Sequence, residues 1–275
     1  MNYQWFAEEV ETSAPLAAGL LPGVQGLQNA TVKAITEDPD NQFRVQVTVH
    51  SMTADSQPGE LWARWIQPYA SKDAGFFFMP EIGDEVILAF LNDDPRFPVI
   101  LGSVYSSNNS PASQPAEDNP IKSIVSKEKL TVEMDDKNKV LTIKTPGNNQ
   151  IILSDDDKAI TIKTAEGNQI ILSDQDKGIT MKDQNSNQIV MNSDGIEIKS
   201  ASDITINATG SLTEKAAKLS ASYSSEASLS ATGSFSISGL ELEVKGDTSF
   251  SASAPQAKVS ADAMLTLQGA LIKIN

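Results

Sequence analysis

The feature that most constrains this chain is a nineteen-residue repeat in its middle part. "QIILSDDDKAITIKTAEGN" begins at Gln150, "QIILSDQDKGITMKDQNSN" follows at Gln169, and a third copy begins at Gln188. A weaker copy in the same register begins at Thr131. Each copy holds two short strand-like pieces, such as 150–153 and 160–163, separated by turn segments rich in Asp, Gly and Asn. The repeat therefore predicts a run of short strands.

Two strands of this length cannot bury enough apolar surface to be stable alone, so the copies must stack. In "ITIK" (160–163) the isoleucines alternate with Thr and Lys, which makes one face of the strand apolar. We expect no helix in this chain that could cover that face. Three sheets related by a threefold axis would form a prism with the apolar faces inward. We therefore predict an obligate homotrimer, in which the repeats either form antiparallel hairpins or wind about the axis.

After Gly195 the repeating unit shortens to about eight residues, and Ser, Ala, Gly and Thr dominate. Units begin at Ile196, Ile204 and Leu212, and apolar positions continue to the final "LIKIN". A tract rich in Ser and Ala is also compatible with disorder. Because the apolar positions persist, we favour an intertwined trimeric β-helix, in which small side chains let three chains approach closely near an axis.

The part that precedes the repeats has the composition of an ordinary compact domain. Five strand signals lie within about 75 residues, at 31–36, 43–50, 61–66, 85–90 and 98–104. In the second, Phe43, Val45, Val47 and Val49 share one face. Five short strands without a convincing helix favour a small closed barrel of the OB type.

The predicted fold class is all-β, an N-terminal OB-fold barrel followed by an intertwined trimeric β-helix or β-prism. The expected domains are a connector at 1–28, the OB-fold domain at 29–105, a linker at 106–125, the prism at 126–199 and the β-helix with the C-terminal tip at 200–275. The linker is expected from "SSNNSPASQPAEDNP" at 106–120, which is rich in Ser, Pro and Asn.

Charge and composition exclude several classes of partner and site. The formal net charge of −15 would repel nucleic-acid phosphates and anionic lipids, so neither is expected as a partner. The chain has no cysteine, which rules out disulfides and thiolate metal sites. No run approaches the ~20 apolar residues of a membrane span. The N-terminal "MNYQWFAEEV" lacks a basic region, so we expect assembly in the cytoplasm without a signal peptide.

Three features of the sequence are candidate chemical sites. The one histidine, His50, ends a strand on its polar face, and no Ser–His–Asp set can be built around it, so we expect no catalytic residue and no cofactor. Residues 76–78, all Phe, could stack nucleic-acid bases, but the charge favours a place in the barrel core and a contact with a neighbouring subunit. "SDDDK" at 154–158 lacks the spacing of a calcium loop, so a solvated turn is favoured and no metal site is expected.

Residues 61–105 carry a resemblance to a known family. The pieces are "LWARWIQPYA", "GFFFMPEIGDEV" and "DPRFPVILGSVY", in that order. They resemble the OB domain of VgrG-like and contractile-phage central spike proteins, and the repeats that follow resemble the family's trimeric β-helix. Gly83 and Asp84 are expected to form a turn before a buried strand, and Pro95 and Pro98 to fix a hairpin entry. The residues of this motif are expected to have structural roles only. They are Trp62, Arg64, Gly83, Asp84, Pro95 and Gly102.

The resemblance implies a rigid needle in a contractile injection system and no enzymatic activity. The implied partners are baseplate hub or tail-tube proteins and a PAAR-like tip protein or effector. The needle is expected to act outside the producing cell or in the target cell. It is expected to contact a target membrane only by piercing it. Full-length relatives carry a hub domain before the barrel, which is expected here to be missing or a separate polypeptide. The seat for the tip is placed at the C-terminus: Leu271, Ile272, Ile274 and Asn275. The alternative function is a trimeric phage tail fibre or adhesin.

Overall fold

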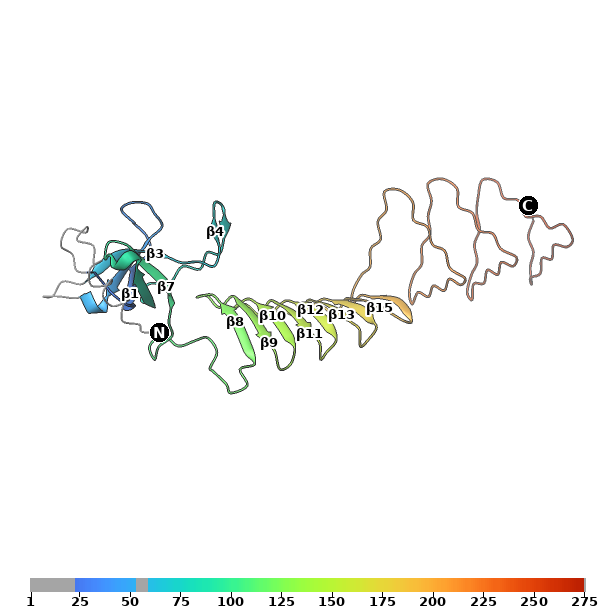
Figure 1. The fold of residues 1–275 in the computed structure, drawn as a ribbon. Coiled ribbons are helices and arrows are strands. Elements are labelled where there is room, and N and C mark those ends of the chain that lie inside the picture. The colour runs from blue at the N-terminus through green and yellow to red at the C-terminus, as the bar shows by residue number, and fades with distance from the viewer. Residues whose placement is uncertain (1–22, 53–58, 275) are drawn as a thin grey trace, which may run out of the picture. The chain divides into compact units, whose positions relative to one another are not determined.

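The computed structural model describes residues 23–52 and 59–274 (Figure 1). All regular elements in this part are strands, apart from two 3-10 turns, η2 (His50–Met52) and η3 (Leu91–Asp93). The chain divides into a unit that ends at Thr205 and a unit that begins at Ile206. The all-β fold class predicted from the sequence is confirmed.

The first sheet is a closed five-stranded barrel with the strand order β1-β2-β3-β7-β6. Its strands pair antiparallel except for β3 and β7, which run parallel. Their bounds are β1 (Gln28–Ala34), β2 (Val45–Val49), β3 (Glu60–Trp65), β6 (Glu85–Phe90) and β7 (Pro98–Ser103). A closed barrel of five short strands is the OB-type architecture expected from the sequence.

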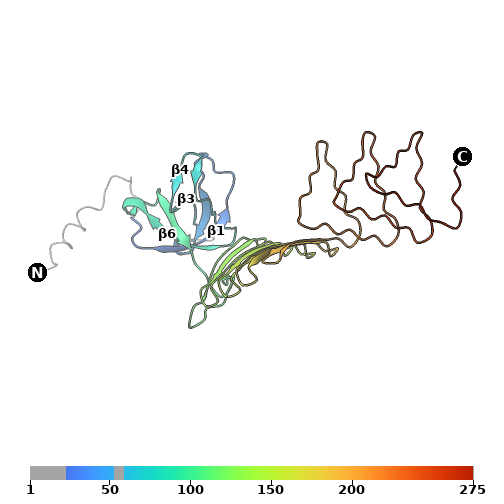
Figure 2. The same ribbon diagram turned by 90° about the vertical axis from the view of Figure 1, so that its right-hand side faces the viewer.

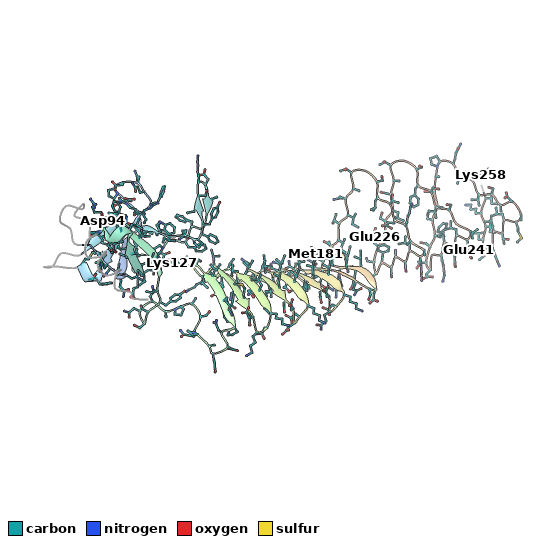
Figure 3. All side chains as sticks on the ribbon, in the orientation of Figure 1. Asp94, Lys127, Met181, Glu226, Glu241 and Lys258 are labelled. Carbon is teal, nitrogen blue, oxygen red and sulfur yellow. The ribbon has the colours of Figure 1, made fainter. Side chains whose placement is uncertain are left out.

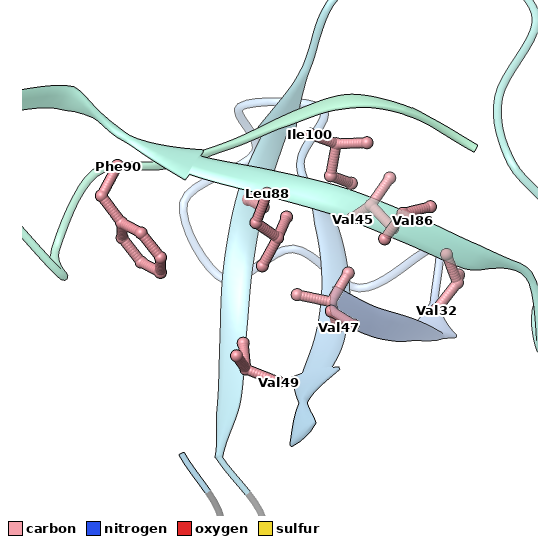
Figure 4. Close-up of a cluster of buried hydrophobic side chains, with 10 residues drawn as sticks. Val32, Val45, Val47, Val49, Val86, Leu88, Phe90 and Ile100 are labelled. Carbon is pink, nitrogen blue, oxygen red and sulfur yellow. The ribbon is translucent and has the colours of Figure 1, made fainter. Parts of the chain in front are cut away.

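The barrel core follows from strict alternation along the strands. In β2 the three valines are buried while Gln46 and Thr48 are only partly so, and β6 repeats the pattern. Figure 4 shows the resulting cluster, with Leu88 among the surrounding valines. The buried set is Ala30, Val32, Val45, Val47, Val49, Ala63, Val86, Leu88, Phe90 and Ile100. Burial of each larger side chain contributes about 1.5–3 kcal/mol, so this cluster is the main source of the barrel's stability.

Phe43 does not share the buried face of β2, which corrects the prediction from alternation. It is 80% exposed and has a φ of 58°, outside the strand. The reason is the preceding turn, where the Asp38 carboxylate accepts hydrogen bonds from the N–H of Gln42 at 2.8 Å and from Arg44 Nε at 3.1 Å. The bonded Arg44 guanidinium holds the pKa of Asp38 well below its usual range. This turn delays the start of β2 to Val45.

A short hairpin, β4 (Ala70–Ser71) and β5 (Ala74–Gly75), follows β3 and is separate from the barrel sheet. Phe76, Phe77 and Phe78 come directly after it and are all exposed, so the expectation that they belong to the barrel core is wrong. The N–H of Phe76 donates to the carbonyl of Tyr69 at 2.9 Å, which extends the hairpin beyond β5. The hairpin pairing thus keeps this segment out of the barrel.

The second sheet has nine antiparallel strands in sequential order, β8 to β16. Consecutive strands pair through tight turns, so the repeats form antiparallel hairpins in this chain. Lys139, Lys158 and Lys177 occupy the same place in three turns, each with a φ near 50°. The bounds are β8 (Ile121–Val125), β9 (Thr131–Asp135), β10 (Val140–Lys144), β11 (Gln150–Ser154), β12 (Ala159–Lys163), β13 (Gln169–Ser173), β14 (Gly178–Lys182), β15 (Gln188–Asn192) and β16 (Gly195–Lys199).

The second unit contains no assigned strand within 206–274. Figures 1 and 2 show this part, in orange to red, as a series of similar wide loops. Its bends recur every seven or eight residues, for example at 209–210, 217 and 224–225. Every residue of 206–274 is exposed, and no backbone–backbone hydrogen bond joins residues within this range. A backbone without internal hydrogen bonds has its donors and acceptors free for other chains.

Candidate trimerisation surface

One face of the nine-stranded sheet carries two continuous apolar rows. Cross-strand pairing aligns Ile151 with Ile162 and Ile162 with Ile170, and this row continues to both ends of the sheet. The second row lies two residues away on every strand, and therefore on the same face. The first row is Ile124, Val132, Ile143, Ile151, Ile162, Ile170, Met181, Ile189 and Ile198. The second starts with Lys122 on β8 and is apolar from β9 onward: Met134, Leu141, Leu153, Ile160, Leu172, Ile179, Met191 and Ile196.

Nothing in the described part of the chain covers these apolar rows. Ile160 is 42% exposed and Ile162 is 44% exposed, whereas their strand neighbours Thr161 and Lys163 on the opposite face are more protected. Figure 3 shows the side chains of the sheet, with Met181 of the first row labelled. A continuous apolar face of this length is far larger than the patches that monomers expose. We therefore expect another protein chain to cover the face that carries the two rows.

The apolar rows also line a concavity of about 560 Å³ at the β12–β16 end of the sheet. Ile162, Ile170, Ile189 and Ile198 contribute to its wall, together with Ile204 just after β16. An apolar hollow of this kind suits side chains inserted from another protein surface. Its wall also includes residues at the ends of these strands, among them Lys163, Lys182 and Lys199.

The predicted tip seat lies in the second unit. Leu271, Ile272 and Ile274 are all exposed, and Asn275 is outside the described residues. Apolar side chains are also exposed earlier in this unit, at Ile206 and Leu212 among others. Exposure therefore does not distinguish the C-terminal residues from the rest of the unit, and their role as a seat stays a prediction.

The motif residues of the barrel lie at structural positions. Trp62 pairs with Gln46 across β2 and β3, and Arg64 pairs with Val99 across β3 and β7. Gly83 has a φ of 96° and donates its N–H to the carbonyl of Val32, in the turn before β6.

The remaining motif residues complete that turn and the β6–β7 hairpin. The Asp84 carboxylate closes the turn by accepting the N–H of Glu81 at 2.9 Å. Pro95 precedes β7 in the turn from β6, and Gly102 pairs with Ile87 beside a register shift. These residues are spread over the barrel and do not form a chemical site.

The three candidate chemical sites lie apart from one another. His50 begins η2, with Nε2 3.0 Å from the Thr31 hydroxyl. Phe77 meets Trp65 edge-on, with ring centroids 5.5 Å apart. The 155–158 turn is organised by the Ser154 hydroxyl, which accepts the N–H of Asp157. Within residues 23–52 and 59–274 there is no group of three or more His, Cys, Asp or Glu that could hold a metal ion.

Two protein families match parts of this chain. Residues 28–105 match the type VI secretion system/phage-baseplate injector OB domain. Residues 159–214 match the phage baseplate V C-terminal trimerisation domain, and this range includes the apolar rows of β12 to β16. In the part of the chain that the structure describes, no helix is long and apolar enough to cross a membrane.

Several curated proteins are similar to this chain. The type VI secretion system spike protein VgrG1b of Pseudomonas aeruginosa is 36% identical over 101 residues, which is 35% of this chain and 14% of that protein. The spike protein VgrG3 of Vibrio cholerae is 29% identical over 138 residues, 48% of this chain and 13% of that protein. The actin cross-linking toxin VgrG1 of Vibrio cholerae is 33% identical over 95 residues, covering 33% of this chain and 9% of that protein. The matched part is thus a small fraction of each relative, and it confirms the resemblance stated from the sequence.

Proposed function

We propose, from the premise that this chain is a VgrG-like spike protein in its OB and trimerisation domains, that it forms a homotrimeric, rigid puncturing needle of a contractile injection system. The observation that carries the proposal is the pair of uncovered apolar rows along β8–β16, part of which lies in the match to a trimerisation domain. Three copies would turn these rows toward a common axis and bury them.

The energy available from this burial is large. Side chains such as Ile160 and Ile162 retain a little under half of their exposure in the single chain. Burying the remainder of one such side chain contributes on the order of 1 kcal/mol, so two rows over nine strands contribute on the order of 15 kcal/mol per chain before the entropy of association. That gain is comparable with the whole stability of a typical domain.

The second unit gains backbone partners in the same assembly. Its residues 206–274 lack hydrogen bonds among their own backbone groups, and two further copies wound beside each chain would supply them. Strands shared among three chains cannot separate without breaking many hydrogen bonds together. Such a shaft transmits an axial force, which is what a puncturing device requires.

The finer parts of the proposal concern partners and place of action. The barrel end would join baseplate hub or tail-tube proteins, and Leu271, Ile272, Ile274 and Asn275 would seat a PAAR-like tip protein or an effector. The domain divisions at 28, 105, 125 and 199 are part of this proposal. The needle would be assembled in the cytoplasm and would meet a target membrane only by piercing it. Its role is mechanical, without catalysis.

Native mass spectrometry of the purified chain tests the trimer directly. We expect three copies in the assembly, and a well-folded single subunit with an ordered tail would contradict the proposal. For the tip, a chain that lacks residues 266–275 should lose binding to a PAAR-like tip protein while it remains trimeric. Unchanged binding by that truncated chain would refute the C-terminal seat and leave the trimer standing.

A further inference from the structure

A row of lysines and glutamines runs along one lateral edge of the nine-stranded sheet. This lateral edge is formed by the ends of the strands and is not one of the edge strands β8 and β16. Lys163 pairs with Gln150 on one side and Gln169 on the other, and the same alternation continues along the sheet. The row lies on the face opposite the apolar rows, because each lysine directly follows a row residue on its strand, as Lys163 follows Ile162. The lysines recur on every second strand, about 10 Å apart. They are Lys144, Lys163, Lys182 and Lys199.

The opposite edge of the sheet carries aspartate-rich turns. The turn between β11 and β12 holds Asp155, Asp156, Asp157 and Lys158, and therefore has a net charge of −2. The next turns along this edge hold Asp174 and Asp176 with Lys177, and then Asp194. In the described part of the chain, neither these aspartates nor the four lysines of the other edge take part in an ion pair.

Threefold symmetry brings these two edges together. When three sheets surround an axis parallel to the direction of strand stacking, each corner joins one edge of a copy to the opposite edge of the next, because a cyclic trimer has heterologous contacts. Rotation about the axis does not change height along it. Lys163 on β12 therefore comes level with the next copy's 155–158 turn, which leads into β12. Lys182 and Lys199 come level with the turns at 174–177 and 193–194 in the same way.

We propose that Lys163 of each copy pairs with the Asp155–Asp157 turn of a second copy of this chain, and that Lys182 and Lys199 form matching pairs further along each corner. Lys144 is not included, since the turn level with it contains Lys137 and Lys139 beside Asp135 and Asp136. This inference rests on the proposed homotrimer, and it adds the residues that join the copies on the outside of the prism.

The pairs would also hold the three chains at equal height. The apolar rows repeat every nineteen residues, so a chain displaced by one repeat still finds isoleucine and leucine opposite its own. The corner charges repeat as well, but with unequal strength. A chain displaced by one repeat in one direction would bring Lys163 level with the turn that holds Lys137 and Lys139, and in the other direction level with Asp174 and Asp176, one aspartate fewer than in the 155–158 turn. The corner pair of Lys163 would thus favour equal height over either displacement.

The test compares two full-length chains with the same change in net charge. Lys163→Glu places a carboxylate at each corner, and Lys72→Glu, in the turn of the exposed β4–β5 hairpin, is the matched control. Native mass spectrometry follows the loss of trimer in urea at low salt. We expect loss on the order of tenfold faster for Lys163→Glu than for the control, as three exposed pairs of about 0.2–1 kcal/mol each are replaced by repulsion.

A compensating variant separates a specific pair from general destabilisation. Adding Asp155→Lys and Asp157→Lys to Lys163→Glu reverses both sides of the corner, and the rate should return to within about threefold of the unaltered trimer. In 1 M NaCl, where the Debye length is about 3 Å, the effect of Lys163→Glu should shrink. Equal rates for Lys163→Glu and Lys72→Glu, or no recovery in the reversed chain, would overturn the inference.

Two further outcomes keep the inference and the proposed function distinguishable. If Lys163→Glu does not fold, Lys163→Gln replaces it, with Lys72→Gln as its control. Loss of trimer should then be about threefold faster for Lys163→Gln than for Lys72→Gln, and equal rates overturn the inference.

An unaltered chain that is not trimeric refutes the proposed function and the corner pairs with it. A trimeric chain insensitive to Lys163 refutes the corner pairs alone.

Discussion

Replacing Ile162 by aspartate tests whether the apolar rows are buried between copies. Ile162 lies in the middle of the first row, between Ile151 and Ile170, and is 44% exposed in the single chain. In the trimer, Ile162→Asp would put three carboxylates at the same height around one axis. The matched control is Thr161→Asp, the same charge one residue earlier on the opposite face.

The expected loss can be worked from this position. Each chain forfeits on the order of 1 kcal/mol of apolar burial, and each enclosed carboxylate adds a desolvation cost of several kcal/mol. Over three chains the sum is on the order of 10 kcal/mol or more, comparable with the stability of a whole domain. Thr161→Asp puts its carboxylate on the face that does not turn toward the axis, beside Ile152 and Ile171, and should cost a smaller amount, about 1–2 kcal/mol per chain.

Native mass spectrometry and light scattering after size exclusion provide the assay. At neutral pH we expect single subunits or aggregates for Ile162→Asp and trimers for Thr161→Asp. Because burial raises the pKa of a carboxyl, lowering the pH should neutralise the introduced group and restore part of the trimer. A population of Ile162→Asp trimers that survives dilution as well as the control would refute the burial of this row.

Two predictions concern the barrel. Leu88→Ala removes a fully buried side chain and should lower the free energy of unfolding of the barrel by about 2–5 kcal/mol in urea titrations, whereas Leu91→Ala, at an exposed position, should change it little. Asp38→Asn should destabilise the barrel at pH 7, and its deficit relative to the unaltered chain should shrink as the pH falls below about 4. The sign follows because the folded-state pKa of Asp38 is depressed, so its stabilising contribution is present above the unfolded pKa and is lost as it becomes protonated; a deficit independent of pH would contradict it.

Much of the architecture was predictable because local alternation decides which face of a strand is apolar. The valines of β2 and the isoleucines of "ITIK" both lie on one face, as their sequence indicates. The resemblance of residues 61–105 to a spike-protein OB domain was equally visible in the sequence, and the family matches confirm it. These predictions depend on residues close together in the chain.

The misassigned positions depend on interactions that alternation does not encode. Phe43 fits the period of β2, yet the hydrogen bonds between Asp38 and Arg44 hold it in the preceding turn. The Phe76–Phe78 run is apolar enough for a core, but the β4–β5 pairing keeps it out of the barrel. In both cases a side chain or backbone partner several residues away overrides a local pattern.

By itself the sequence determined that the repeats form short strands with one apolar face and too little material to cover it. Only the tertiary structure decided how those strands connect. The antiparallel pairing aligns Ile162 with its neighbours into uninterrupted rows, and it sends the lysines to one edge and the aspartate-rich turns to the other. The physical reason is that side-chain alternation is a property of one strand, whereas register is set by hydrogen bonds between consecutive strands joined by a turn.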